Sequence, residues 1–251
     1  MSRIIFITGT GTGVGKTTLT CLLLRHLRRS GVKALAMKPF CSGGKDDLKA
    51  FQEIQGDELG LDLLNPYYFP QPVAPALASN AAKTGVTLRA VLRAIKAAAR
   101  ECECLLVEGA GGVLVPITKK LMMADVIAAL DCEVVVVSKN ELGTLNHTLL
   151  TLEALRSRGV RRLKVVFFKV DKSDISSRTN PKWIKKNPIN IGVIALPFRL
   201  SKVRTADKEM EGTKNFQKTL AQISSPDSFC PVVRTAGKTA KRKTEKRKIK
   251  R

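Results

Sequence analysis

The stretch Gly9-Thr10-Gly11-Thr12-Gly13-Val14-Gly15-Lys16-Thr17 follows an apolar run at residues 4–7 and precedes an amphipathic segment at residues 19–27. This order predicts a strand, a glycine-rich loop and a helix. Glycines let backbone N–H groups turn toward anionic oxygens, and the N-terminus of a helix adds partial positive charge. We therefore predict a phosphate-binding loop in which Lys16 reaches the terminal phosphates and the Thr17 hydroxyl ligates Mg²⁺.

The spacing of this loop differs from the usual Gly-x₄-Gly-Lys-Thr pattern. Thr10 stands where the first glycine would be, so the chain reads Gly9-x₅-Gly15-Lys16-Thr17. A glycine-rich turn by itself is often only a tight connection between two elements. One that ends in Gly-Lys-Thr behind a strand of buried type strongly favours nucleotide binding. We therefore expect the chain to bind ATP or GTP.

The length and composition indicate one large α/β core with a short appendage. The chain has 251 residues, 44% of them hydrophobic, and no apolar run approaches the length of a membrane span. Only four strongly apolar residues follow the first three, which is too few for a secretory signal. The six cysteines (21, 41, 102, 104, 132 and 230) form no Cys-x-x-Cys pair. We therefore expect reduced core thiols and a cytoplasmic protein.

The formal net charge of +23 is high for an enzyme that acts on small molecules. Residues 234–251 carry ten lysines and arginines against one acid, Glu245, and contain no aromatic residue. We predict that this end of the chain is disordered, and we divide the chain into a folded domain, residues 1–223, and a basic tail, residues 224–251. The tail could bind nucleic acid or an acidic partner, but the lack of aromatic residues for base stacking favours a solvated tail.

Six short runs that are apolar on both faces indicate strands of a parallel sheet, at residues 4–7, 35–37, 105–107, 134–137, 165–168 and 191–196. Apolar residues recur at helical spacing in residues 87–100 and 148–158, and the second segment stops at Gly159, a residue suited to end a helix. This alternation predicts a doubly wound α/β fold of the P-loop NTPase type, mainly parallel, with helices on both faces. The ligand would lie beyond the carboxyl ends of the strands.

Two long connections interrupt this alternation. Residues 66–75 hold four prolines and both tyrosines, so we expect an extended surface segment that is neither a central strand nor a helix. This segment either walls a substrate pocket or covers the sheet edge. Residues 171–190 are polar and rich in lysine, and we expect a second connection there.

Charged residues stand at the ends of two predicted strands. Glu108 follows the third apolar run and opens Gly109-Ala110-Gly111-Gly112, so its carboxylate is placed to hold Mg²⁺ beside the phosphate loop. Lys38 ends the second strand, where it is either a cation for an anionic intermediate or a solvated lysine. Asp46 and Asp47 begin the next predicted helix, either as plain N-terminal acids or with one of them as a second Mg²⁺ ligand.

Together these motifs resemble the dethiobiotin synthetase family over roughly residues 3–200. Five separated segments carry the resemblance in the family's order, and their joint occurrence is highly specific. They are the loop from Gly9 to Thr17, Lys38-Pro39-Phe40-Cys41-Ser42-Gly43, Asn65-Pro66-Tyr67 with the prolines up to Pro75, Glu108-Gly109-Ala110-Gly111-Gly112 with Pro116, and Leu142-Gly143-Thr144-Leu145-Asn146-His147.

The resemblance implies an ATP- and Mg²⁺-dependent ligase of biotin synthesis. Its substrates would be 7,8-diaminononanoate, CO₂ and ATP, and the product dethiobiotin would form through a carbamate and a carbamic–phosphoric anhydride. Lys16 and Lys38 would act as catalytic residues by neutralising the carbamate and the migrating phosphoryl group. Family members are homodimers whose partner chain closes the substrate site, and residues 143–146 occupy that segment here.

The resemblance also assigns residues to each part of the site. Mg²⁺ would be held by Thr17, Asp47 and Glu108. Asp47 is chosen over Asp46 because Gln52 then also aligns. The substrate would bind Thr12, Ser42 and Asn146. The nucleotide would contact Gly13, Val14, Gly15, Lys16, Thr17, Thr18, Asp47, Glu108, Gly109, Ala110, Gly111, Pro197, Phe198 and Arg199.

Several features depart from the family pattern. Gly11 replaces an aspartate of the phosphate loop, and Gly13 stands where glutamate is frequent, so both remove negative charge near the phosphates. Lys169 stands where the family often reads adenine with an asparagine. A lysine cannot accept a hydrogen bond, so nucleotide preference stays open and base contacts are expected from residues 197–199. The basic tail also lies outside the family pattern.

Other classes share a phosphate loop. A partition- or septum-positioning ATPase would bind nucleic acid or a membrane through the basic tail. Such proteins carry a second lysine early in the loop, where this chain has Gly11, and they lack the Lys38 and Ser42 pair. An amide-forming relative from cobalamin synthesis would need a glutamine-hydrolysing domain, for which 251 residues leave no room. A non-catalytic nucleotide binder would not need Lys38, Ser42 and Glu108 together. We expect no membrane partner and no major role for nucleic acid.

Overall fold

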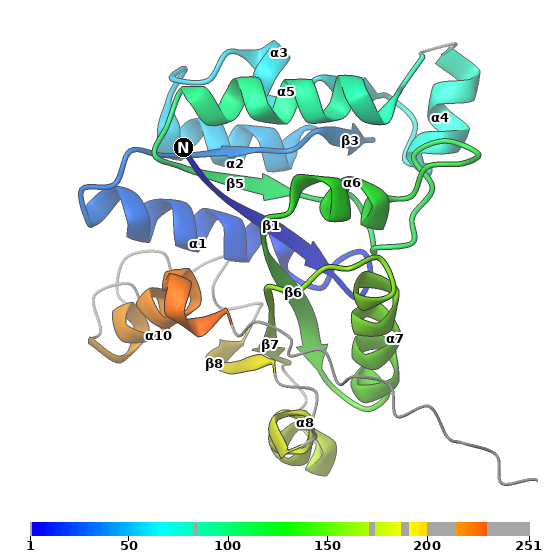
Figure 1. The fold of residues 1–251 in the computed structure, drawn as a ribbon. Helices are drawn as coiled ribbons and strands as arrows, with labels where there is room; N and C mark the ends of the chain where they lie inside the picture. Colours follow the sequence, from blue (N-terminus) through cyan, green and yellow to red (C-terminus); the bar gives the residue numbers. More distant parts are fainter. Residues whose placement is uncertain (1, 83–84, 171–173, 187–190, 200–213, 230–251) are drawn as a thin grey trace, which may run out of the picture.

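The structure, a computed structural model, describes residues 2–82, 85–170, 174–186, 191–199 and 214–229. Its centre is a sheet of six parallel strands in the order β2-β5-β1-β6-β7-β8, with helices on both faces (Figure 1). The chain therefore starts in the middle of the sheet and builds outward in both directions. The doubly wound, mainly parallel α/β fold that the sequence predicts is confirmed.

The strands of this sheet are buried on both faces because helices cover both faces. In β6, for example, all four valines at residues 134–137 are fully buried. Five of the six apolar runs predicted as strands lie within one strand of the sheet, and the run at residues 191–196 begins one residue before its strand. The strands are β1 (Arg3–Gly9), β2 (Ala34–Met37), β5 (Cys104–Glu108), β6 (Glu133–Asn140), β7 (Leu163–Lys169) and β8 (Gly192–Arg199).

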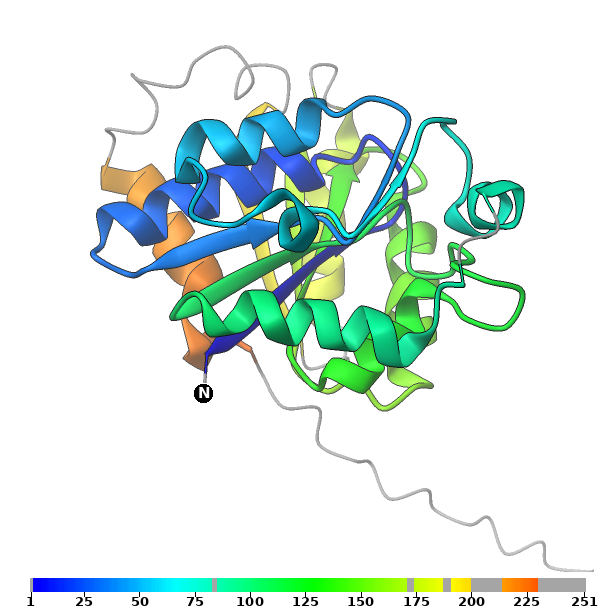
Figure 2. The same cartoon turned by 90° about the horizontal axis from the view of Figure 1, so that it is seen from above.

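Helices form a layer on each face of the sheet. On one face α1 (Lys16–Arg29) packs between α2 (Asp46–Gln55) and α10 (Lys214–Ser224), as Figure 2 shows from above. On the other face neighbouring helices follow one another in chain order. They are α5 (Leu88–Arg100), α6 (Met123–Leu130), α7 (Thr144–Arg156) and α8 (Ile175–Lys186).

The predicted helix at residues 148–158 begins four residues earlier, at Thr144. Gly143 precedes it with a φ of 89°, a left-handed conformation that turns the chain directly from β6 into α7. Gly159 follows the helix with a φ of 81°, as expected for a residue that ends it.

Small elements occupy the two long connections. β3 (Phe40–Ser42) pairs in parallel with β4 (Tyr67–Phe69), so the proline-rich segment is extended and lies outside the main sheet, as predicted. Two short helices flank this pair, α3 (Leu61–Leu64) and α4 (Pro75–Ala82). The last proline of the segment therefore starts a helix, where its missing N–H costs nothing. The predicted connection at residues 171–190 instead contains α8, which buries Asn180 and Ile184.

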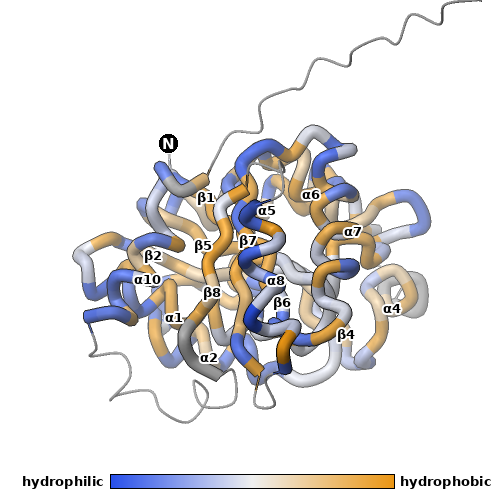
Figure 3. The backbone as a smooth tube through the Cα atoms, turned by 90° about the horizontal axis from the view of Figure 1, so that it is seen from below, coloured by the Kyte–Doolittle hydropathy of each residue, from blue (hydrophilic) through white to orange (hydrophobic). Residues whose placement is uncertain are grey.

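The hydropathy of the chain follows these layers. Figure 3 shows apolar residues along the strands and polar residues on the outer helices. Among the described helices, none combines the length and the apolar character needed to cross a bilayer. The five described cysteines are free thiols, and four of them are buried, while Cys230 lies outside the described residues.

The described structure continues beyond residue 223, where the sequence analysis places the end of the folded domain. α10 ends at Ser224, a short 3₁₀ helix follows at Pro226–Ser228, and the Phe229 side chain is buried. The anchor of this end is Lys164 of β7, whose ammonium donates to the carbonyl oxygens of Gln222 (3.0 Å) and Ile223 (2.6 Å). The same ammonium lies 3.9 Å from the centre of the Phe229 ring. Residues 230–251, most of the predicted tail, lie outside the described residues.

Burial lowers the pKa of Lys164 to about 7, with Glu133 opposing this shift and Arg3 adding to it. A lysine in the unfolded chain titrates near pH 10.4, so between about pH 7 and pH 10 the unfolded chain binds more protons than the folded one. The folded state therefore gains stability as the pH rises through this window. We expect the wild type to gain stability relative to Lys164→Met from pH 7 to pH 9.5 in urea unfolding. A difference that stays constant with pH contradicts this prediction.

Candidate active site

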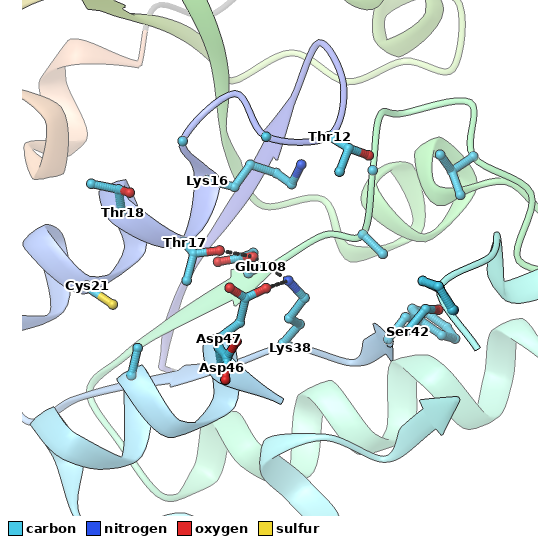
Figure 4. A pocket seen from close by; sticks show the side chains of 18 of the residues that line it. Thr12, Lys16, Thr17, Thr18, Cys21, Lys38, Ser42, Asp46, Asp47 and Glu108 are labelled. Atoms are coloured by element: carbon cyan, nitrogen blue, oxygen red, sulfur yellow. Dashed lines mark hydrogen bonds and ion pairs between the residues drawn. The ribbon is translucent and has the colours of Figure 1, made fainter. Parts of the chain in front are cut away.

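The carboxyl ends of β1, β2 and β5 meet at one edge of the sheet and line a cleft of about 1150 Å³ (Figure 4). The parallel register explains which residues meet there. Ile7 of β1 pairs with Glu108, and Met37 of β2 pairs with Val107, the residue before Glu108. The phosphate loop and Lys38 therefore leave the sheet on either side of the Glu108 carboxylate.

The phosphate loop has the backbone conformation that its glycines allow. Gly13 and Gly15 have φ angles of 71° and 105°, and residues with a side chain rarely adopt such angles. At Gly9 a Cβ atom would lie 2.6 Å from a methyl carbon of Val14, so the loop folds back closely on the end of β1. α1 begins immediately after Gly15, which directs its unpaired N-terminal N–H groups into the cleft.

Lys16 is held across this loop. Its ammonium donates to the carbonyl oxygen of Gly11 at 2.7 Å, and the residue is 6% exposed. Burial lowers the pKa of Lys16 to about 8, although the Glu108 carboxylate partly restores it. An anion placed in the loop would favour the charged form of this lysine.

Glu108 is the centre of the site and is fully buried. One carboxylate oxygen, Oε1, accepts from the Thr17 hydroxyl at 2.9 Å and from the Lys38 ammonium at 2.7 Å. The other, Oε2, accepts from the Thr20 hydroxyl at 3.1 Å. A buried carboxylate with donors on both oxygens keeps its orientation.

The ammonium of Lys38 contacts two carboxylates. Besides Glu108 it contacts the Asp47 carboxylate, from the first turn of α2. Burial alone would lower the pKa of Lys38, but Glu108 and Asp47 outweigh it and raise that pKa above its ordinary value. Burial likewise opposes the charge of Asp47, but Lys38 lowers the pKa of its carboxyl. Asp46 is not part of this cluster, because its side chain is 94% exposed and lies 3.9 Å from Lys49 (Figure 4).

The glycines after Glu108 let the loop that follows this residue approach neighbouring parts of the chain closely. A Cβ at Gly111, whose φ is 60°, would lie 2.6 Å from a methyl carbon of Val115 and 3.8 Å from the Thr12 hydroxyl. Ala110 and Gly111 both line the cleft, whereas Gly109 packs against Phe6. A Cβ at Gly112 would lie 3.6 Å from the carbonyl oxygen of Gly9, so the second glycine loop packs directly against the first.

Ser42, at the end of β3, lines an arm of the cleft together with Pro72, Val73 and Pro75. Its hydroxyl oxygen is buried and, among the described residues, has no hydrogen-bond partner. A buried hydroxyl without a hydrogen-bond partner destabilises the folded protein, and a ligand that forms a hydrogen bond with it would remove this cost. The proline-rich segment therefore lines this arm of the cleft, and its role toward a substrate stays a prediction.

The other end of the cleft is lined by Lys139, Glu141, Lys169 and Val170. The backbone of Arg199 pairs with Lys169, so the end of β8 runs alongside this region. The side chains of Pro197, Phe198 and Arg199 lie outside what the structure describes. Whether they contact a base stays a prediction.

Most of the residues expected from the sequence line one cleft. They are Thr12, Gly13, Gly15, Lys16, Thr17, Thr18, Lys38, Ser42, Asp47, Glu108, Ala110 and Gly111. Val14 and Gly109 pack behind their loops, and Asn146 is exposed on α7, outside the lining of this chain's cleft. The sequence analysis missed Thr20, Cys21, Arg25, Lys139 and Glu141. For Thr20 a signal existed, because it follows Thr17 by three residues and so shares its helix face.

The donor set suits Mg²⁺. Thr17, Asp47 and Glu108 bring a hydroxyl and two carboxylates together, and hard oxygen ligands are those that Mg²⁺ prefers. Within the described residues, no group of three or more histidine, cysteine and acidic side chains is close enough to hold a metal alone. The Mg²⁺ sites of phosphoryl-transfer enzymes usually combine one or two carboxylates with phosphate oxygens.

Solved structures with this fold include ATPases of another class. A plasmid partition protein of Borrelia burgdorferi B31, bound to AMPPNP, has a TM-score of 0.57 and 12% identity, covering 88% of this chain and 97% of that one. A ParA family ATPase of Chlorobium tepidum TLS has a TM-score of 0.52 and 15% identity, covering 91% and 94%. At such identities the likeness shows the fold alone.

The sequence comparisons are more specific. Residues 3–228 match a family model described as an AAA domain. The chain is 41% identical over 197 residues to the ATP-dependent dethiobiotin synthetase BioD of Anaeromyxobacter dehalogenans, strain 2CP-C, covering 77% of this chain and 84% of that protein. It is 37% identical over 185 residues to the protein of the same name in Akkermansia muciniphila, covering 73% and 87%. With the cleft and its charged cluster in place, these matches show that the chain belongs to the family of ATP-dependent dethiobiotin synthetases.

Proposed function

We propose that the chain catalyses the ATP-dependent formation of dethiobiotin from 7,8-diaminononanoate and CO₂, a step of biotin synthesis. The observation that carries this proposal is the buried Lys38, paired with Asp47 and Glu108 beside a phosphate loop, in a member of this family. A fixed cation beside the phosphate site suits a reaction in which a second anion must approach the γ-phosphate.

The reaction would run in three steps. One amine of the diamine attacks CO₂ and loses a proton, which leaves a carbamate. A carbamate oxygen then attacks the γ-phosphorus of ATP, the bond to the β,γ-bridging oxygen breaks, and ADP leaves. This gives a carbamic–phosphoric anhydride. The second amine attacks its carbonyl carbon, loses a proton and expels phosphate, which closes the ureido ring.

The phosphate loop and the charged cluster would bind the triphosphate. Lys16 and the N-terminus of α1 face the same part of the cleft, so both would neutralise the phosphate oxygens. Thr17, Asp47 and Glu108 would hold Mg²⁺, which when bound supplies positive charge to the β- and γ-phosphates. Lys38 would hold the carbamate oxygen close to the phosphate that it attacks.

The arm at Ser42 would bind the diamine. The Ser42 hydroxyl is buried there and has no hydrogen-bond partner within the part of the chain that the structure describes, and the Thr12 hydroxyl lies where the two glycine loops meet. Asn146 is exposed on α7, and two leucines close to it in the chain are exposed as well: Leu142, just before the helix, is 81% exposed, and Leu150, within it, is 57% exposed. We therefore propose a homodimer in which Asn146 reaches the substrate of the partner subunit. The free thiols agree with the cytoplasmic location that we propose.

The test is incubation of the purified protein with Mg-ATP and bicarbonate, with and without 7,8-diaminononanoate. We expect phosphate release that depends on the diamine and a product with the mass of dethiobiotin. Phosphate release that is indifferent to the diamine contradicts the proposal.

Two further experiments use the same assay. Reactions with GTP or CTP in place of ATP measure the nucleotide preference, which the presence of Lys169 leaves open. A chain that ends at Phe229 is expected to keep its turnover, since the described residues that line the cleft all lie between Thr12 and Val170.

Ser42→Ala is expected to raise the KM for the diamine about tenfold, because the substrate loses one hydrogen bond from a buried hydroxyl. The KM for ATP should stay within about twofold, since the phosphate loop is unchanged. Steady-state kinetics with each substrate varied in turn measures both values. An equal rise in the two KM values would show that Ser42 acts on the whole cleft and not on the diamine arm.

A further inference from the structure

Thr20 is a buried threonine of α1 that the proposed reaction does not yet use. It lies one turn after Thr17 on the same face of the helix and is fully buried. Its hydroxyl lies 3.1 Å from Oε2 of Glu108 and 3.0 Å from the carbonyl oxygen of Lys16. Thr20 therefore touches both the carboxylate at the centre of the site and the backbone of the phosphate-loop lysine.

The two oxygens of Glu108 have different partners. Oε1 faces the cleft side of the cluster, where Thr17 and Lys38 donate to it. Oε2 faces α1 and accepts from Thr20, whose single hydroxyl proton it shares with the carbonyl oxygen of Lys16. A carboxylate that is fully buried cannot turn toward water, so its rotation is set by the donors that the protein supplies. Donors on both oxygens hold the plane of the carboxylate in one orientation.

We propose that Thr20 is a positioning residue, whose hydroxyl holds Oε2 of Glu108 so that Oε1 stays directed at Thr17 and Lys38. This inference rests on the proposed function, in which Glu108 helps to hold Mg²⁺. Hydrogen bonds that orient a metal-binding carboxylate typically change metal affinity 10–100-fold when they are removed. The role of Thr20 should therefore be visible as a loss of metal-dependent nucleotide affinity.

Three variants separate the hydroxyl from the packing of the side chain. Thr20→Val keeps the shape and removes the hydroxyl, while Thr20→Ser keeps the hydroxyl. Thr151→Val is the matched control, because Thr151 is a nearly buried threonine of α7 whose hydroxyl donates to the carbonyl oxygen of His147, four residues earlier, at 2.8 Å. It has the same backbone contact as Thr20 but no contact with Glu108.

The experiment is calorimetric titration of AMPPNP into each protein, once with MgCl₂ and once with EDTA. The ratio of the two dissociation constants gives the gain in affinity from Mg²⁺. We expect Thr20→Val to lower this gain about tenfold, with the dissociation constant in EDTA changed less than about threefold. Thr20→Ser should stay within about threefold of the wild type in both arms, and Thr151→Val should match the wild type.

Three results overturn the proposal. The first is a Thr20→Val protein that keeps the full gain from Mg²⁺. The second is a Thr20→Ser protein that loses as much as Thr20→Val, since packing would then explain the effect. The third is a wild type that gains nothing from Mg²⁺. No diamine is present in this titration, so the role of Thr20 can fail while diamine-dependent phosphate release stands, and the reverse also holds.

Discussion

Replacing Lys16 with alanine is expected to lower diamine-dependent phosphate release roughly a hundredfold or more, because removing one donor that stabilises transition-state charge typically has an effect of that size. The ammonium of Lys16 is buried and held by the Gly11 carbonyl, so it is already in place within the loop. The reaction therefore does not require the side chain of Lys16 to become ordered, which would cost conformational entropy. Initial rates of phosphate release at saturating diamine measure the loss.

Lys49→Ala is the control for Lys16→Ala. Lys49 lies on α2 near the same cleft, but its side chain is 71% exposed. A solvated lysine at the surface contributes little to the field inside the site, so its removal should change the rate less than about twofold. If Lys16→Ala keeps more than about a tenth of the wild-type rate, Lys16 does not carry transition-state charge.

Much of the fold was predictable because a parallel sheet covered on both faces needs strands without polar interruptions. The runs at residues 134–137 and 165–168 meet that need and lie in β6 and β7. α8 was missed because its pattern is weak. It buries only two of its residues deeply, Asn180 and Ile184, and Pro181 stands inside it, so neither apolar spacing nor helix propensity marks it.

In the candidate site, too, some positions follow from the sequence pattern, whereas others depend on how the helices pack. Glu108 and Lys38 each end an apolar run, and the parallel register alone brings neighbouring strand ends together. The choice between Asp46 and Asp47 needs the helix itself. One residue turns a helix by about 100°, and this rotation places Asp47 against Lys38 and Asp46 in solvent. The predicted start of α2 at these two acids is confirmed, but a sequence pattern does not determine how the helix is rotated against Lys38.

Replacing Lys38 with methionine is expected to lower turnover roughly a hundredfold while AMPPNP binding without Mg²⁺ changes less than about threefold. Methionine keeps much of the length of the lysine stem and removes the ammonium. Lys38 contacts the two acids and lies away from the Gly11 carbonyl that holds Lys16, so the phosphate loop should keep its shape. Equal losses in binding and turnover would identify a structural lysine.

The double variant Lys38→Met/Glu108→Gln tests the structural part of this effect. Lys38→Met alone leaves the fully buried Glu108 without its paired ammonium, which should lower the free energy of unfolding by about 3 kcal/mol. Neutralising Glu108 as well removes the uncompensated charge, so stability in urea unfolding should recover part of that loss. Turnover should stay low in the double variant, because it also lacks a carboxylate that we propose to hold Mg²⁺. A double variant that is no more stable than Lys38→Met would show that Lys38 does not compensate the charge of Glu108.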